Sequence, residues 1–147
     1  MDIIPTVQIT DIIPQRKPFV FVDSLLQCDE DTAVTALRIR EDSLFAYDGV
    51  FQTAGLIENI AQSCVAKIGY IAKYVEHGKV TIGYIGNVHH LKVNRNPEVG
   101  ETIHTTVIFG ENIAGIQLCE AVVRVGDEII AQSSIKTAQD DSKPVDD

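Results

Sequence analysis

The chain has 147 residues, of which 45% are hydrophobic and 22% are charged. These proportions suit one globular domain with a sizeable core and leave little room for a second domain. Twelve basic and 21 acidic residues give a net charge of −9 at neutral pH, the wrong sign for a protein that binds nucleic acid by neutralising phosphates. We therefore expect neither nucleic acid nor a membrane surface as a partner.

The sequence also predicts a cytoplasmic location. No stretch approaches the roughly 20 apolar residues of a transmembrane helix, and the N-terminus lacks the basic and apolar regions of a signal peptide. Cys28, Cys64 and Cys119 are widely spaced, without a Cys-x-x-Cys pair. This pattern indicates three reduced packing residues and neither a disulfide framework nor a metal site.

The spacing of apolar residues and the positions of proline and glycine predict mainly strands along the chain. Residues 11–18 are too rich in proline for a strand and predict a helical turn or loop. Six segments either alternate apolar with polar residues or are rich in β-branched and aromatic residues. They predict strands at 19–26, 32–40, 80–93, 102–109, 116–125 and 128–137. Gly126 and Asp127 predict a two-residue hairpin between the last two strands.

One long helix is predicted between residues 51 and 76, where apolar residues recur every three to four positions. Between Phe51 and Ala72 the only charged residues are Glu58 and Lys67. A helix this apolar must be covered on most sides. A glycine at position 78 supplies its stop.

One helix among several strands predicts an α+β domain in which a curved antiparallel sheet is wrapped around one long central helix. A parallel sheet is disfavoured because each crossover would need its own helix. We assign residues 1–139 to this single domain. Residues 140–147 hold four acidic residues and one lysine, which predicts a disordered tail.

Glu58 is the most informative single residue of the helix. A carboxylate in a helix built for burial loses solvation, and such acids gather at functional sites. Gln62 follows one helical turn later. The alternative interpretation is that Glu58 and Gln62 form a structural hydrogen-bond network.

Three segments resemble a known family, the hotdog-fold (3R)-hydroxyacyl-[acyl carrier protein] dehydratases of the FabA/FabZ type. Residues 13–23 read IPQRKPFVFVD and are similar to the family's LPHRYPFLLVD. Residues 55–62, GLIENIAQ, are similar to its VLxExxAQ, and residues 86–100 match a strand and turn more weakly. The resemblance spans residues 11–138 and implies a hotdog fold, Glu58 as a catalytic residue and Gln62 as a substrate-binding residue.

The chain departs from this family at the catalytic histidine. Aligned on Glu58 and Gln62, the family's GHFPG loop falls on residues 43–50, SLFAYDGV, with Leu44 at the histidine position and Phe45 retained. A leucine cannot transfer a proton, so half of the acid–base pair that dehydration needs is missing. We expect Glu58 and Gln62 to share one pocket at a subunit interface, next to Leu44 or Phe45, with an apolar tunnel that leads away for an acyl chain.

Four histidines are candidates to replace the missing one. His77 ends the helix, and His104 alternates onto the solvent side. His89 and His90 are consecutive in a strand and are expected to point to opposite faces, so only one of them can enter a pocket. We take His89 as a candidate substrate-binding residue. No ligand spacing supports a metal site.

The resemblance implies a substrate carried on the phosphopantetheine of an acyl carrier protein, with no bound cofactor, in fatty-acid or polyene-type acyl chain synthesis. Carrier proteins are acidic, so docking needs a local basic patch, for which Arg16, Lys17, Lys92 and Arg95 are candidates. The resemblance also implies a dimer paired through the strand at 80–93. Three functions stay open: a dehydratase impaired as a homodimer, a non-catalytic subunit in a heterodimer with an active hotdog dehydratase, and an acyl thioesterase.

Overall fold

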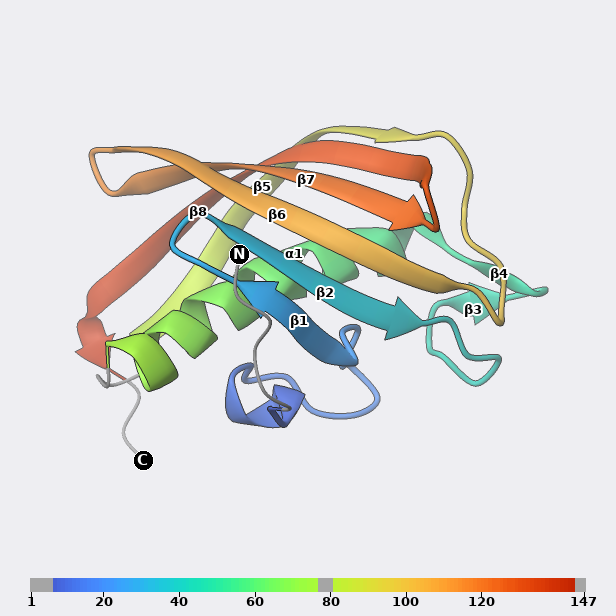
Figure 1. Ribbon diagram of the computed structural model, residues 1–147, viewed down its shortest axis with the longest axis horizontal. Helices are drawn as coiled ribbons and strands as arrows, with labels where there is room; N and C mark the ends of the chain where they lie inside the picture. The colour runs from blue at the N-terminus through green and yellow to red at the C-terminus, as the bar shows by residue number, and fades with distance from the viewer. Residues whose placement is uncertain (1–6, 77–80, 145–147) are drawn as a thin grey trace.

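The computed structural model describes residues 7–76 and 81–144, with the backbone alone for 81–86 and 139–144. A six-stranded antiparallel sheet in the order β1-β2-β6-β7-β8-β5 curves around one helix, α1. Figure 1 shows α1 lying along the concave side of the sheet. The predicted fold class is confirmed. No helix among the described residues is long and apolar enough to cross a membrane.

The elements follow the predicted order closely. The strands are β1 (Ser24–Cys28), β2 (Thr32–Arg38), β3 (Ala46–Tyr47), β4 (Val50–Phe51), β5 (Thr81–Val93), β6 (Thr102–Ile113), β7 (Ile116–Val125) and β8 (Glu128–Pro144). Helix α1 (Thr53–Tyr70) continues into a π-helical turn (Ile71–Val75), and a short 3-10 turn (Ile9–Asp11) precedes β1. The predicted hairpin at Gly126 and Asp127 joins β7 to β8, with Val125 opposite Glu128.

The core lies between α1 and the concave face of the sheet. On α1, Leu56, Ile60 and Cys64 follow the helical spacing and are fully buried. Alternate residues of the strands face them, among them Val107 and Val123. All three cysteines are buried and free, as the sequence predicts.

The segment before β1 is held against α1 rather than in the sheet. At Gly69 the helix has no Cβ, which lets the backbone of Ile12 approach closely. Asp23 accepts a hydrogen bond from the Arg38 amide at 2.8 Å and pairs with Arg40 at 3.0 Å. The predicted strand at 19–26 begins only at Ser24, because backbone groups of Phe19 and Phe21 bond to side chains of α1 rather than to a neighbouring strand.

The last strand is longer than predicted. β8 continues to Pro144, and Thr81 of β5 lies opposite Pro144 in the register. The segment expected to be a disordered tail is thus part of the sheet over residues 140–144, while 145–147 lie outside the described residues. Pairing with β5 explains this extension, since ladder hydrogen bonds need backbone groups and no apolar side chain. β5 itself lies at one edge of the sheet.

Candidate functional site

One stripe of α1 faces away from the core. Ala54, Ile57 and Glu58 are exposed, Ala61 is half-buried, and Val65, one turn further along, is half-buried and packs against the edge of the core. The spacing is that of one helix face. Apart from Glu58, every member of this stripe is apolar. In the single chain the helix therefore presents an apolar surface around one carboxylate.

Glu58 and Gln62 do not share a hydrogen-bond network. The Gln62 side chain is buried, and its Oε1 accepts from the Phe21 amide at 2.7 Å while its Nε2 donates to the Phe19 carbonyl at 2.9 Å. Glu58 makes no hydrogen bond or ion pair within the part of the chain that the structure describes. Gln62 therefore has a structural role, as the alternative interpretation expects, but Glu58 does not share its hydrogen-bond network. The Glu58 carboxylate is available to a ligand or to a second subunit.

A buried amide on α1, Asn59, was not singled out from the sequence. Its Nδ2 donates to the Phe21 carbonyl at 2.7 Å, and its Oδ1 accepts from Thr105 Oγ1 at 2.6 Å. One turn later, Ser63 Oγ donates to the Asn59 carbonyl and lies 2.7 Å from Thr35 Oγ1. The sequence does indicate Asn59 in one way, since it is a polar residue in a helix whose pattern is otherwise apolar. Asn59 and Gln62 together fix the backbone of residues 19–21 on the helix.

In the loop before α1, Phe45 packs inward and Leu44 points outward. The Phe45 ring packs on Phe21 at 5.0 Å between centroids, and its carbonyl accepts from the Gln52 amide at 2.8 Å. The Leu44 side chain is 51% exposed. The residue at the missing histidine position thus projects outward beside the start of α1, while its neighbour anchors the loop.

The two adjacent histidines do not lie on opposite faces. The β5 register shifts between His89 and Lys92, and His90 adopts a φ of 54°. This bulge inserts one residue into the strand, so the rings of His89 and His90 lie 6.1 Å apart. The expectation from strict alternation is wrong here.

His89 lies on the face of the sheet that points away from α1. It is opposite Ser134, whose hydroxyl bonds Glu120 on the same outer face, whereas the neighbouring Val88 packs into the core. Within one chain the structure does not bring His89 to Glu58. Its Nε2 is buried without a hydrogen-bond partner among the described residues.

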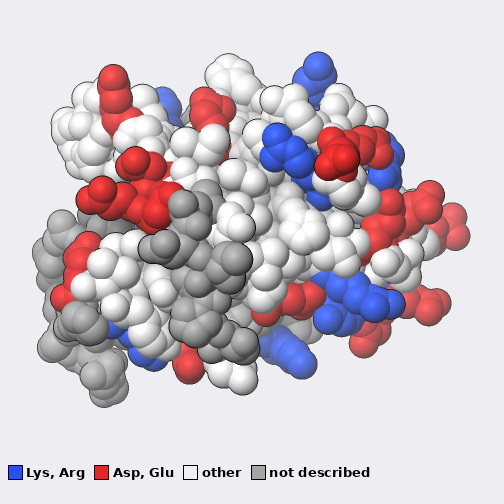
Figure 2. Space-filling model, in the orientation of Figure 1, with Lys and Arg blue, Asp and Glu red and all other residues white. Residues whose placement is uncertain are grey.

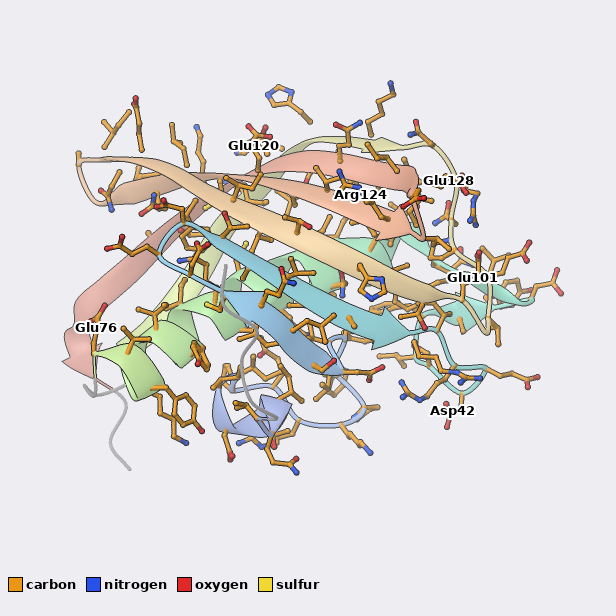
Figure 3. The ribbon with its side chains drawn as sticks, viewed as in Figure 1. Asp42, Glu76, Glu101, Glu120, Arg124 and Glu128 are labelled. Carbon is orange, nitrogen blue, oxygen red and sulfur yellow. The ribbon has the colours of Figure 1, made fainter. Side chains whose placement is uncertain are left out.

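The basic residues proposed for carrier docking differ in whether their charge is already paired with an acidic side chain. Arg95 donates to Glu101 at 2.8 and 3.0 Å and to Glu128 at 3.0 Å, so its charge is more than balanced. The arginine holds the pKa of Glu101 below its ordinary range. Figure 3 shows Glu101 and Glu128 at the same end of the molecule. Arg95 is therefore a structural ion-pair partner rather than a free cation.

The other three docking candidates remain exposed. Arg16 donates to the Ile13 and Gln15 carbonyls, and Lys17 follows it before β1, whereas Lys92 lies on β5. On the face drawn in Figure 2, basic groups are interspersed with acidic ones. Carrier docking stays a prediction.

A cavity of about 670 Å³ lies at the C-terminal half of α1. Its walls include Lys67, Glu76, Phe109 and Thr137. Glu76 is at the opposite end of the molecule from Asp42, which is close to the Leu44 loop (Figure 3). This cavity is thus separate from the predicted site around Glu58, and the apolar tunnel stays a prediction that needs a second subunit.

Lys67 is the buried cation of this cavity. Its side chain is almost fully buried, its Nζ donates to the Glu30 carbonyl at 2.7 Å, and the same atom lies 4.2 Å from the centroid of the Phe109 ring. The residues that the structure describes contain no group of three or more His, Cys, Asp or Glu able to hold a metal ion.

Comparisons with known proteins assign the chain to a family. The family model ApeP-like, described as ApeP dehydratase, matches residues 7–145. The 3-hydroxyacyl-[acyl-carrier-protein] dehydratase FabZ of Rickettsia typhi is 27% identical over 137 residues, covering 89% of this chain and 92% of the relative. FabZ of Bacillus cytotoxicus is 23% identical over 138 residues, covering 92% and 96%.

Solved structures agree on the fold. A chain of the dehydratase heterocomplex ApeI:P from Xenorhabdus doucetiae superposes with a TM-score of 0.83 at 12% identity, over 93% of this chain and 94% of that one. A hypothetical thioesterase with coenzyme A from Streptococcus pneumoniae gives 0.66 at 6% identity, over 84% and 88%. At these identities the likeness establishes the hotdog fold alone. Because the family match covers nearly the whole chain, the protein belongs to the ApeP-like dehydratase family.

Proposed function

We propose that this chain is a dehydratase-like subunit that binds 3-hydroxyacyl thioesters of an acyl carrier protein and dehydrates them slowly as a homodimer. Full activity then requires a second hotdog subunit that carries the missing histidine. The observation that carries this proposal is that Glu58 is exposed and has no partner among the described residues, while Leu44, also exposed, stands where dehydratases of the FabA/FabZ type have histidine.

The chemistry explains why one group is insufficient. Dehydration removes a proton from C2 of the acyl chain and expels the hydroxyl on C3 as water, so it needs a base at one carbon and an acid at the other. Glu58 can hold or donate a proton, whereas Leu44 can do neither. The substrate brings its own phosphopantetheine arm, so the proposed reaction needs no bound cofactor.

The surface around Glu58 supports an intersubunit site. On this helix face Ala54 and Ile57 are exposed and Ala61 is half-buried, and monomeric proteins seldom leave an apolar stripe of this kind uncovered. A second subunit would exclude water from Glu58 and give the acyl chain an apolar wall.

A heterodimer is favoured over a homodimer as the working form. A homodimer would have Leu44 at the histidine position of both of its sites. The structurally similar chain from Xenorhabdus doucetiae comes from a heterocomplex of dehydratases. We propose that a partner with an intact GHF motif combines its histidine with Glu58 across the interface.

The test measures conversion of a 3-hydroxyacyl carrier thioester to the enoyl product by mass spectrometry. The purified chain is assayed alone, with a hotdog subunit that has an intact GHF motif and is encoded beside it, and that subunit is assayed alone. We expect the mixture to exceed the sum of the separate rates. Glu58→Gln in this chain should lower the mixture's gain by about 10²–10⁴-fold, and Glu41→Gln, an exposed acid outside the stripe, should leave it unchanged.

Two results would contradict the proposal. The first is a mixture no faster than its separate components, or one indifferent to Glu58→Gln. The second is release of the free carrier thiol without enoyl product, which would identify the chain as a thioesterase.

A further inference from the structure

Lys67 carries a buried positive charge that has no counter-ion in contact with it. The residue is 4% exposed. Its Nζ donates to the Glu30 carbonyl at 2.7 Å and lies 4.2 Å from the centroid of the Phe109 ring, and both of these partner groups are neutral. No carboxylate of the residues that the structure describes forms an ion pair with Lys67. A buried charge is costly unless a group of opposite charge balances it.

The acidic residues of the turn between β1 and β2 do not fill this role. Asp29 Oδ1 accepts hydrogen bonds from the backbone amides of Asp31 and Thr32, at 2.9 and 2.8 Å. Glu30 and Asp31 are exposed to solvent. An ammonium group has three donors, so Lys67 Nζ keeps donor capacity for a group that enters from the cavity.

The cavity beside Lys67 is large enough for a small organic molecule. Its volume of about 670 Å³ lies within the roughly 300–1,000 Å³ of ligand pockets. Two of its lining residues, Lys67 and Thr137, are buried, whereas its three acidic lining residues, Glu30, Asp31 and Glu76, are exposed. The cavity therefore has one positive charge at its inner end and negative charges at its rim.

One wall of the cavity is aliphatic and comes from the end of the helix. Ile68, Ile71 and Ala72 form it. Ile71 begins the π-helical turn, in which the Glu76 amide donates to the Ile71 carbonyl at 2.9 Å. Such turns are rare and are frequently found at functional sites. Ile71 follows Lys67 by one helical turn, about 6 Å along the axis, so a short aliphatic chain whose polar end meets Lys67 can lie along this wall.

We propose that this cavity is a binding site for a small organic monocarboxylate, whose carboxylate contacts Lys67 Nζ and whose aliphatic body packs on Ile68 and Ile71. A carboxylate accepts charge-assisted hydrogen bonds from an ammonium group and supplies the missing counter-ion. The acidic residues at the rim disfavour a ligand with a second negative charge. The site is separate from Glu58 and does not depend on the proposed dehydratase function.

The experiment uses hexanoate as the probe, with hexanamide and adipate as matched controls. Hexanamide has the same chain without the charge, and adipate has the same number of carbons with a second carboxylate. Each compound is titrated into the full chain at constant ionic strength, and backbone amide shifts are followed by two-dimensional NMR. We expect hexanoate to shift the amides of Gly110 and Thr137, which line the cavity, in a saturable way. It should bind at least about tenfold more tightly than either control, because a hydrogen bond between charged groups is lost with one and a repelled charge is added with the other.

Two variants test the role of the ammonium group. Lys67→Met keeps an unbranched apolar side chain, and removal of a buried charge that lacks a counter-ion is compatible with folding. This variant should bind hexanoate about tenfold more weakly or worse. Lys73→Met is the matched control, because Lys73 is exposed on the π-helical turn and does not line the cavity. It should leave the affinity for hexanoate unchanged.

Several results would overturn the proposal. The first is equal affinity of the wild type for hexanoate and either control, which needs no variant. Others are shifts of the same size with sodium chloride, an affinity that Lys67→Met leaves unchanged, and shifts centred on the amides of Leu44 and Glu58 instead of the cavity. That last result would place hexanoate at the proposed dehydratase site and leave the proposed function intact. A failed dehydratase assay would in turn leave the binding result intact, so the two proposals are tested independently.

Discussion

Thr105 Oγ1 donates a hydrogen bond of 2.6 Å to Asn59 Oδ1 at the centre of the core, where neither side chain is reached by solvent. The same Asn59 donates from Nδ2 to the Phe21 carbonyl. One amide thereby connects α1, β6 and the segment that leads into β1. Polar groups this deep stabilise a fold only when each has its partner.

Thr105→Val tests this connection. The substitution preserves shape but leaves Asn59 Oδ1 without its donor, and an unsatisfied buried polar group costs about 1–3 kcal/mol. We expect the free energy of unfolding, measured by urea titration at one fixed protein concentration, to fall by that amount. Thr102→Val, at an exposed position of the same strand, should change it by no more than about 0.5 kcal/mol. Equal effects at both positions would refute the prediction.

Gln62→Leu tests how the segment before β1 is held. The change removes both the acceptor of the Phe21 amide and the donor to the Phe19 carbonyl, at about 1–3 kcal/mol for each buried group left unpaired. We expect the Phe21 amide to exchange its hydrogen faster than in the wild type. Amides in the middle of β6 should slow or speed up only as much as the change in global stability requires. Gln132→Leu, on an exposed position of β8, is the matched control and should leave Phe21 protected.

Much of the fold could be predicted because its signals are local. The switch from alternating residues to a 3.6-residue period marks α1, and Gly126 with Asp127 marks a hairpin. Sequence periodicity does not predict the structure of residues 140–144 and 19–23, because that structure depends on partners distant in the chain. Residues 140–144 gain a strand from pairing with β5, and residues 19–21 are bound by amides of α1.

The candidate site divides in the same way. Glu58 stands out in the sequence because it interrupts an apolar helix, and the structure gives it the exposed stripe. Lys67 interrupts the same helix, but its contacts with Glu30 and Phe109 appear only when three elements meet. The bulge that brings the rings of His89 and His90 together could not be predicted, because two consecutive histidines do not indicate a bulge.

The ion pairs of Arg95 predict how acid affects stability. The folded-state pKa of Glu101 is below its ordinary value because Arg95 and a backbone amide bond the carboxylate. A depressed carboxyl pKa contributes stability above the unfolded-state pKa, and that contribution is lost as pH falls through the folded-state pKa. We expect the wild type to lose stability below about pH 4.5 more steeply than Glu101→Gln does. Glu41→Gln, at an exposed position, should keep the wild-type slope, and coincident profiles for wild type and Glu101→Gln would contradict the assignment.

The apolar stripe of α1 predicts association. We expect the purified chain to sediment as a dimer at micromolar concentration, because pairing covers the stripe and protects the long β5 edge. Ile57→Asp should weaken the dimer by about tenfold or more, since a charge in an apolar contact is left desolvated. Ile129→Asp is matched, as both isoleucines are 36% exposed, and it should leave the dimer intact. A stable monomer of the wild type would count decisively against the stripe as an interface.

Leu44→His tests the impaired site itself. Leu44 is 51% exposed while Phe45 anchors the loop on Phe21, so a histidine can replace the leucine without disturbing the core. A positioned general acid or base is typically worth about 10²–10⁴ in rate. We expect the homodimer of Leu44→His to dehydrate a 3-hydroxyacyl carrier thioester faster than wild type by up to that factor. Adding Glu58→Gln should remove the gain, because two groups that act as a unit are strongly non-additive. Leu44→Gln, polar but unable to transfer a proton at neutral pH, should remain as slow as wild type. If the wild-type homodimer already works at the rate of ordinary family members and Glu58→Gln does not slow it, both the impaired-site argument and the role of Glu58 fail together.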